Sequence, residues 1–238
     1  MTEPTVKTRA GACWECGAAF GAEHFCPACG KIQTQRAEQD YFSFFGLSRK
    51  LVVDPDLLER QFHQLSWKLH PDNFSTASVY ERELSLEKAA VLNDAYRTLR
   101  DPIARVEYLL ALEGIRREGE IKQQAPPELL EEVFELNEYL EELRVAKRAP
   151  PVAGQARGDT RELDDLLHRL EAARRQFEAK LEAVQEEFFA RFREWDALLD
   201  GATDSSAQRQ KLEQMSEILN RHSYLRNLVR NVSEELDD

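Results

Sequence analysis

All four cysteines of the 238-residue chain lie in one short window near its start, as two Cys-x-x-Cys pairs. The first pair is Cys13 and Cys16, and the second is Cys26 and Cys29, followed by Gly30. Each pair with its following glycine is typical of a tight turn that points two thiolates at one metal ion. Two such turns supply the tetrahedral four-thiolate shell that structural zinc prefers. The spacing therefore predicts one structural zinc ion held by all four cysteines.

Other uses of the cysteine pairs stay open. A reducing compartment disfavours disulfides, and a redox Cys-x-x-Cys motif needs a βαβ setting that is absent here. Iron or an iron–sulfur cluster also suits four thiolates. His24 precedes Cys26 by two residues, and we interpret it as a surface residue because four thiolates complete a structural site. Residues 31–39 are polar and non-periodic, which indicates a linker.

A second candidate group is the tripeptide His70-Pro71-Asp72, which ends an amphipathic helix. Proline removes a backbone donor and disfavours helical geometry in the residue before it, so Pro71 stops the helix. A polar His and Asp are thereby held at the helix tip, where a partner can reach them. Asp54 and Pro55 suit the helix start. The apolar face has helical spacing: Leu58, Phe62, Leu65 and Leu69.

The surrounding segments predict a small helical domain. Residues 40–47 are rich in aromatic side chains, and Gly46 is placed to close a short helix there. A long helix is expected over about 79–100, and Asp101-Pro102 breaks it before a further helix at 103–112. The two long helices are expected to pack as an antiparallel hairpin over the aromatic segment.

The remaining chain predicts an acidic three-helix bundle. Helices are expected at about 128–147, 160–199 and 205–235, with a Pro- and Gly-rich loop at 150–158. Seven glutamates and no Lys or Arg lie between residues 128 and 142. Most such runs are a solvated face, but the spacing also permits an exposed apolar and acidic strip. The long aromatic seam of the second helix is interpreted as bundle core.

Composition narrows the function classes. The sparse glycine and proline suit an all-α protein, and the net charge of −12 argues against nucleic-acid binding. No apolar run reaches the length of about 20 residues that spans a bilayer, so no membrane partner is expected. No phosphate-binding glycine loop or catalytic Ser/His/Asp set stands out, which favours a non-enzyme. The expected location is the bacterial cytoplasm, or the mitochondrial matrix in a eukaryote.

These motifs together resemble a J-domain: the opener YFSFFGL, the amphipathic helix with its basic outward face, the His-Pro-Asp loop and the string NDAYRTLRDP. The resemblance implies docking on a DnaK/HscA-type heat-shock ATPase. It further implies that His70, Pro71 and Asp72 trigger ATP hydrolysis by that partner. Arg60 and Lys68, on the exposed face of the basic helix, are the expected docking residues.

The strings TLRDPIARVEYLLALEG and LLEEVFELNEYLEEL narrow the resemblance to HscB-type co-chaperones of iron–sulfur cluster assembly. The tetracysteine module matches eukaryotic-type members. In this family the bundle binds the cluster scaffold protein, IscU. The residues carried over as scaffold-binding are Leu130, Phe134, Glu135, Glu138, Glu142 and Tyr224.

The predicted organisation has three parts: a zinc module with linker at 1–37, a J-domain at 38–113, and a scaffold-binding bundle at 114–238. The expected function is a co-chaperone that delivers the scaffold to the ATPase and stimulates ATP hydrolysis. The alternative is a general J-domain co-chaperone that recruits unfolded clients, which a long apolar groove without preference for the scaffold would favour.

Overall fold

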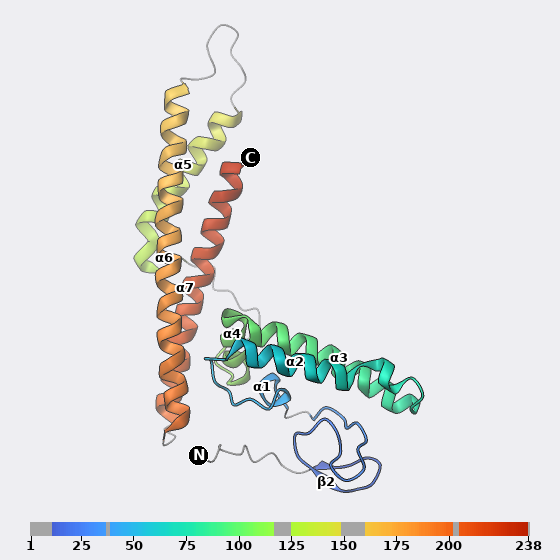
Figure 1. The fold of residues 1–238 in the computed structure, drawn as a ribbon. Helices are drawn as coiled ribbons and strands as arrows, with labels where there is room; N and C mark the ends of the chain where they lie inside the picture. The colour runs from blue at the N-terminus through green and yellow to red at the C-terminus, as the bar shows by residue number, and fades with distance from the viewer. Residues whose placement is uncertain (1–10, 37–38, 117–124, 149–159, 202–204, 238) are drawn as a thin grey trace. The chain divides into compact units, whose positions relative to one another are not determined.

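A computed structural model of the protein describes residues 11–36, 39–116, 125–148, 160–201 and 205–237 (Figure 1). The chain divides into two compact units: residues 1–112 with 195–202, and residues 113–194 with 203–238. The predicted boundary at residues 37 and 38 lies outside the described residues, and the three-part division stays a prediction. The all-α fold class is confirmed, with only two very short strands among the described residues.

The first unit begins with the cysteine module. Strand β1 (Gly11–Ala12) pairs antiparallel with β2 (Ala19–Phe20), and Phe25 forms a bridge to Ile32. Ile32 and Gln33 are each only 1% exposed. The prediction that a linker starts at residue 31 is therefore wrong, because these residues complete the module.

Four α-helices and one 3-10 turn follow among the described residues of the first unit: α1 (Tyr41–Phe44), α2 (Pro55–Leu69), the 3-10 turn η1 (Pro71–Phe74), α3 (Val79–Arg100) and α4 (Pro102–Leu112). Asp54 caps α2, since its side chain accepts from the backbone N–H groups of Asp56 and Leu57. Ser78 and Glu81 form a capping box at the start of α3. The predicted helix bounds are confirmed to within a few residues.

The hairpin of α2 and α3 packs by the faces that the periodicity predicts. Phe62 of α2 stacks on Tyr96 of α3 with ring centroids 4.2 Å apart. Ser85 of α3 donates its hydroxyl to the carbonyl oxygen of Leu69 at 2.7 Å, which ties the end of α2 to α3. Figure 1 shows the two helices side by side. The apolar core beneath them includes Phe42, Phe44, Leu58, Leu69, Leu92 and Leu99.

A buried guanidinium joins the ends of these helices. Arg105 of α4 donates to the carbonyl oxygens of Leu99 at 2.6 Å and Arg100 at 3.3 Å, and also to that of Leu51. The last carbonyls of a helix have no partner within it, so Arg105 satisfies two of them at the end of α3. The same side chain holds the segment that leads into α2.

The last turn of α6 also belongs to the first unit. Trp195 donates its indole N–H to the carbonyl oxygen of Arg49 at 2.9 Å. The two carboxylate oxygens of Asp196 accept from the backbone N–H groups of Leu51 and Val52 at 2.7 and 2.9 Å. These bonds satisfy backbone donors of the segment before α2, which no strand or helix would otherwise pair.

The second unit is the predicted three-helix bundle. It contains the 3-10 turn η2 (Pro127–Leu129), α5 (Leu130–Arg148), most of α6 (Thr160–Asp200) and α7 (Ser205–Asp237). The predicted loop at 150–158 lies outside the described residues. The aromatic seam is confirmed as core: Leu170, Phe177, Val184, Phe188 and Phe192. None of the helices in the described ranges has an apolar stretch of the length that a bilayer crossing requires.

Replacing Arg105 with methionine should strongly destabilise the first unit. The substitution keeps much of the side-chain volume but leaves three carbonyl oxygens without this donor. Each buried group left unpaired costs about 1–3 kcal/mol, so we expect a loss of about 3 kcal/mol or more in the free energy of unfolding, measured by urea denaturation. Arg97→Met, at an exposed position of α3, should cost under about 0.5 kcal/mol. Equal costs for both variants would contradict this reading.

Candidate functional site

The four cysteine sulfurs form one compact group. The ligand atoms of Cys13, Cys16, Cys26 and Cys29 all lie within 4.8 Å of one another, and all four cysteines are free. Two of the sulfur–sulfur distances, Cys13 to Cys29 and Cys16 to Cys26, are 3.6 and 3.7 Å. A tetrahedral shell with metal–sulfur distances of about 2.3 Å has sulfur–sulfur edges of about 3.8 Å. The group therefore fits a metal ion held by four thiolates.

Each Cys-x-x-Cys pair is shaped by the same turn. Gly17 and Gly30 have φ values of 71° and 73°, in the left-handed region that favours glycine. Their backbone N–H groups donate to the carbonyl oxygens of Cys13 and Cys26, both at 2.9 Å. The backbone N–H of Ala28 also donates to the sulfur of Cys26 at 3.4 Å. The predicted pair of metal-binding turns is thus present, with the glycines where the geometry requires them.

The thiols differ in how readily they ionise. Burial raises the pKa of Cys13, but hydrogen bonds from the backbone N–H groups of Cys16 and Glu15, together with those from the neighbouring thiols, outweigh it and bring the pKa to about 6. The backbone N–H of Lys31 lowers the pKa of Cys29, but burial and the neighbouring thiols raise it further, to about 12. Clustered thiolates repel one another, and a bound cation removes that repulsion. The four clustered cysteine sulfurs therefore favour the binding of a cation between them.

Gln33 is a site residue that sequence reasoning missed. Its side-chain amide nitrogen lies 3.3 Å from the sulfur of Cys13 and 2.8 Å from the carbonyl oxygen of Lys31, and it donates to both. Such an outer partner orients a metal-ligating side chain. The polar sequence around Gln33 gave no sign of its burial. The Phe25–Ile32 bridge, formed across the second cysteine pair, places it there.

His24 is not the surface residue that we predicted. Its Nε2 lies 3.0 Å from the carbonyl oxygen of Phe44, and its Nδ1 lies 3.4 Å from the amine of Lys88, which is buried in α3. Burial, together with the charge of Lys88, lowers the pKa of His24 to about 4, so the ring is neutral at pH 7. A neutral ring donates through Nε2 and accepts through Nδ1. One feature of the sequence points to this buried contact: Lys88 stands between Leu84 and Leu92 on the apolar face of α3.

The His-Pro-Asp loop is exposed at the tip of the α2–α3 hairpin. The side chain of Asp72 is 89% exposed, and that of His70 is about half exposed. The Nδ1 atom of His70 accepts from the backbone N–H of Asp72 at 3.3 Å, and Asn73 donates its side-chain amide to the carbonyl oxygen of Trp67 at 2.6 Å. These local bonds order the loop, and the carboxylate of Asp72, with one oxygen 3.5 Å from Nδ1 of His70, stays largely exposed.

Arg60 and Lys68, the predicted docking residues, are both exposed on α2. They lie eight positions apart, about two helical turns, so they share one side of the helix. Trp67 lies next to Lys68 and is among the most exposed large apolar side chains of the described chain. Lys68 therefore lies in the last turn of α2, next to the loop, whereas Arg60 lies about two turns further from it.

The predicted scaffold-binding residues lie mainly on α5. Leu130 and Phe134 are 55% and 65% exposed, although large apolar side chains are usually buried. Glu135, Glu138 and Glu142 are exposed and form no ion pair within the described part of the chain. We call these five residues the acidic strip. Its exposure excludes a purely core role for α5.

The opposite side of α5 is engaged within the bundle. Glu132 pairs with Lys180 of α6 at 3.0 Å, and Arg144 pairs with Glu235 of α7. Tyr224 of α7 is half-buried, and burial raises its pKa. It lies one turn after Arg221, whose guanidinium pairs with Glu128, just before α5.

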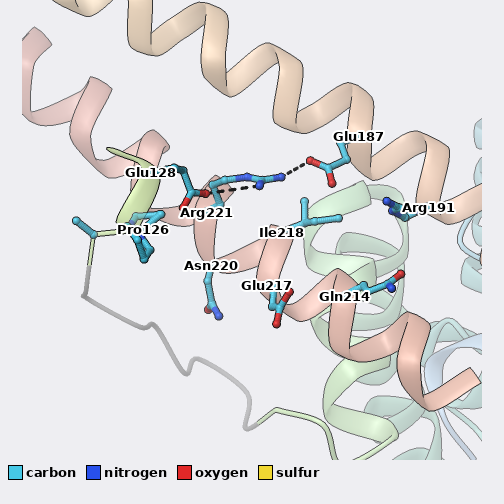
Figure 2. Close-up of a pocket in the computed structure, with 11 residues that line it drawn as sticks. Pro126, Glu128, Glu187, Arg191, Gln214, Glu217, Ile218, Asn220 and Arg221 are labelled. Carbon is cyan, nitrogen blue, oxygen red and sulfur yellow. Dashed lines mark hydrogen bonds and ion pairs between the residues drawn. The ribbon is translucent and has the colours of Figure 1, made fainter. Parts of the chain in front are cut away.

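A hollow of about 540 Å³ lies beside α7 in the second unit (Figure 2). Its lining includes Pro126, Gln214 and Asn220, and Arg221 pairs there with both Glu187 and Glu128. None of the residues that the sequence singled out lines this hollow.

Comparison with known proteins gives a consistent result. No protein-family model matches the chain. The co-chaperone protein HscB homolog of Vibrio cholerae is 43% identical over 122 residues, which cover 51% of this chain and 70% of that protein. The mouse iron-sulfur cluster co-chaperone protein HscB is 33% identical over 166 residues, covering 68% of this chain and 71% of that protein.

The fold agrees with these relatives. The crystal structure of human co-chaperone protein HscB matches with a TM-score of 0.63 and 27% sequence identity, and the match covers 94% of this chain and 98% of the human one. The chaperone HscB from Vibrio cholerae matches with a TM-score of 0.51 and 30% identity. The chain belongs to the HscB family of iron–sulfur cluster co-chaperones.

Proposed function

We propose that this co-chaperone binds an IscU-type iron–sulfur scaffold and delivers it to a DnaK/HscA-type heat-shock ATPase. The observation that carries the proposal is the exposed His70-Pro71-Asp72 loop, held between two packed helices and flanked by basic residues on α2. Family membership supplies the cluster-assembly context. The ATP hydrolysed in this process belongs to the partner, so the chain acts as an adaptor.

The loop is suited to trigger a partner through charge. A carboxylate that is 89% exposed loses little on docking if an arginine of the partner replaces its water, because charge-assisted hydrogen bonds are stronger than neutral ones. Arg60 and Lys68 then steer α2 toward an acidic surface of the ATPase and raise the rate of encounter. His70 caps the turn that positions Asp72.

The acidic strip is suited to a different partner. Exposed Leu130 and Phe134 offer apolar contact area, and three unpaired glutamates beside them favour a basic surface. Interfaces of this kind draw most of their affinity from a few buried aromatic or charged side chains. We assign this surface, with Tyr224, to the scaffold.

We assign zinc to the four-thiolate group, because four cysteine thiolates in a closed tetrahedral shell are typical of structural zinc. The residues that would hold it are Cys13, Cys16, Cys26 and Cys29. Bound zinc would supply folding free energy to a module too small to bury a sufficient core. We propose the bacterial cytoplasm, or the mitochondrial matrix in a eukaryote, as the location of the protein.

Asp72→Asn should reduce stimulation of the ATPase by about tenfold or more, because it removes the charge from the proposed trigger. The measurement is the rate of ATP turnover by the cognate chaperone with and without this protein. Asp56→Asn, an exposed carboxylate at the other end of α2, should leave stimulation unchanged. If Asp72→Asn stimulates like the unaltered protein, the trigger assignment is wrong.

Phe134→Ala should weaken scaffold binding by about 1–3 kcal/mol, as expected for a buried interface anchor. Titration calorimetry with the purified scaffold measures this change. Phe189→Ala removes another exposed phenylalanine of the second unit and should leave affinity within about 0.5 kcal/mol. If Phe134→Ala binds the scaffold with unchanged affinity, the exposed face of α5 is only a solvated surface and not a binding site.

The purified protein should contain about one zinc per chain, measured by elemental analysis. Cys29→Ser should lower that content and the thermal stability of the module, because a structural site needs all four ligands. Ser48→Ala, a substitution outside the module, serves as the control and should retain the metal. Less than about half an equivalent of metal in the unaltered protein would contradict the assignment.

A further inference from the structure

The cysteine module contacts the first turn of α3, where the His-Pro-Asp loop ends. The amine of Lys31, two residues after Cys29, lies 2.9 Å from one carboxylate oxygen of Glu81. The side chain of Glu81 is only 8% exposed, whereas that of Lys31 is 39% exposed. The hydrogen bond from Lys31 lowers the pKa of Glu81, so the carboxylate is charged at neutral pH. The pair therefore joins two segments that are 50 positions apart.

The other carboxylate oxygen of Glu81 holds the start of the helix. It accepts from the hydroxyl of Ser78 at 2.9 Å and from the backbone N–H of Ser78 at 3.3 Å. The backbone N–H of Glu81 donates to the hydroxyl of Ser78 at 3.2 Å. This is a capping box, and Ser78 is also the last residue before α3. One carboxylate thus binds both the module and the end of the loop.

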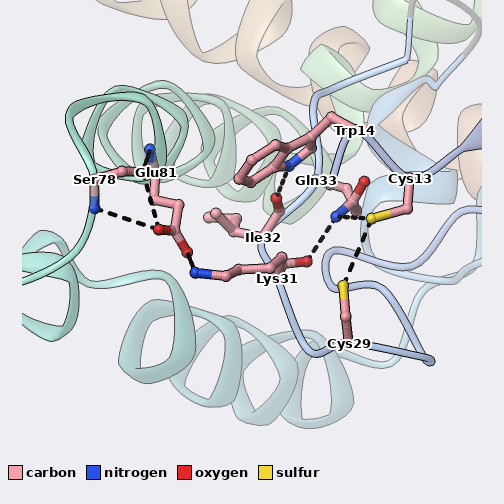
Figure 3. Close-up of polar contacts among 8 residues, drawn as sticks. All are labelled: Cys13, Trp14, Cys29, Lys31, Ile32, Gln33, Ser78 and Glu81. Carbon is pink, nitrogen blue, oxygen red and sulfur yellow. Dashed lines mark hydrogen bonds and ion pairs between the residues drawn. The ribbon is translucent and has the colours of Figure 1, made fainter. Parts of the chain in front are cut away.

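Lys31 is fixed in turn to the metal-binding turns (Figure 3). Its carbonyl oxygen accepts from the backbone N–H of Cys26 and from the side chain of Gln33, both at 2.8 Å. Gln33 is 1% exposed and also donates to the sulfur of Cys13. A continuous set of hydrogen bonds therefore runs from the sulfur group to the capping box.

An aromatic contact lies beside this set. Trp14, which follows Cys13, packs edge-to-face against Tyr80 of α3 with ring centroids 5.0 Å apart. Its indole N–H donates to the carbonyl oxygen of Ile32 at 2.7 Å, which holds the ring in place. The contact and the ion pair engage neighbouring residues of α3. Two separate interactions thus connect the module to the same helix turn.

We propose that Lys31 and Glu81 are positioning residues for the His-Pro-Asp loop, and that metal binding by the module fixes Lys31 in place to brace that loop. This inference rests on the proposed trigger function of the loop. The other end of the loop is already held, because Ser85 bonds the carbonyl oxygen of Leu69. Fixing Ser78 as well reduces the conformational freedom of residues 70–78, so less entropy is lost when the loop docks.

The expected effect is modest. Lys31 is partly exposed, and exposed ion pairs contribute little to stability. Loss of the pair should therefore change loop opening and docking by about two- to fivefold. A brace of this size tunes the loop without being required for folding.

Lys31→Met is the main test variant. Amide hydrogen exchange of residues 73–81 should become about two- to fivefold faster, and the co-chaperone concentration for half-maximal ATPase stimulation should rise by a similar factor. Lys31→Arg keeps the charge and should behave like the unaltered protein. Glu81→Gln keeps the capping box but removes the ion pair, and it should add nothing further to Lys31→Met.

Lys50→Met is the matched control. It breaks an ion pair with Asp200 at 2.8 Å in the same unit, and Lys50 has a similar side-chain exposure of 35%. This variant should leave exchange in residues 73–81 unchanged. An equal effect of Lys50→Met and Lys31→Met would show a general loss of stability and overturn the proposal.

Removing the metal tests whether metal binding acts on the loop through Lys31, or whether Lys31 and Glu81 form an ion pair that does not depend on the metal. After chelation, exchange in residues 73–81 should rise in the unaltered protein, and Lys31→Met should add no further increase. If Lys31→Met changes exchange equally with and without metal, the metal does not act through Lys31. If the unaltered protein fails to stimulate any cognate ATPase, the proposed function fails, while the exchange measurements still decide whether the brace exists.

Discussion

The buried guanidinium of Arg105 is the constraint on which the helical hairpin depends. It bonds carbonyl oxygens at the end of α3 and in the segment before α2, so α4 fixes both helices of the hairpin from one point. A buried cation without such acceptors would be strongly unfavourable, which means that these segments must meet at Arg105. The exposed His-Pro-Asp loop lies at the opposite tip of the hairpin.

Most of the helical fold could be predicted from periodicity and helix-stop signals. Pro71 and Pro102 follow the ends of α2 and α3, Asp54 precedes the start of α2, and the aromatic seam of α6 is core. The cysteine spacing likewise predicted the four-sulfur group. What the sequence could not show were contacts between segments far apart: His24 with Lys88, Lys31 with Glu81, and the burial of Gln33. Each involves a polar residue whose partner is set by tertiary packing, and periodicity carries no information on that.

The candidate surfaces differ in their chemistry, which suits an adaptor with two partners. The tip of α2 is basic and ends in an exposed aspartate, whereas the strip on α5 is apolar and acidic. The loop lies in the first unit and the strip in the second, and each is supported by packing within its own unit. Charge complementarity alone would then direct the two partners to different parts of the chain. The cysteine module adds contacts to α3 within the first unit.

We propose that one molecule must engage both partners for the scaffold to reach the ATPase. The most direct measurement mixes two variants, Asp72→Asn and Phe134→Ala, in equal amounts with the chaperone and the scaffold, and follows ATP turnover. Each variant retains one surface. We expect the mixture to give no more turnover than Phe134→Ala alone, since no molecule carries both surfaces. Recovery of the turnover seen with the unaltered protein would show instead that the two surfaces act independently and that one molecule need not carry both.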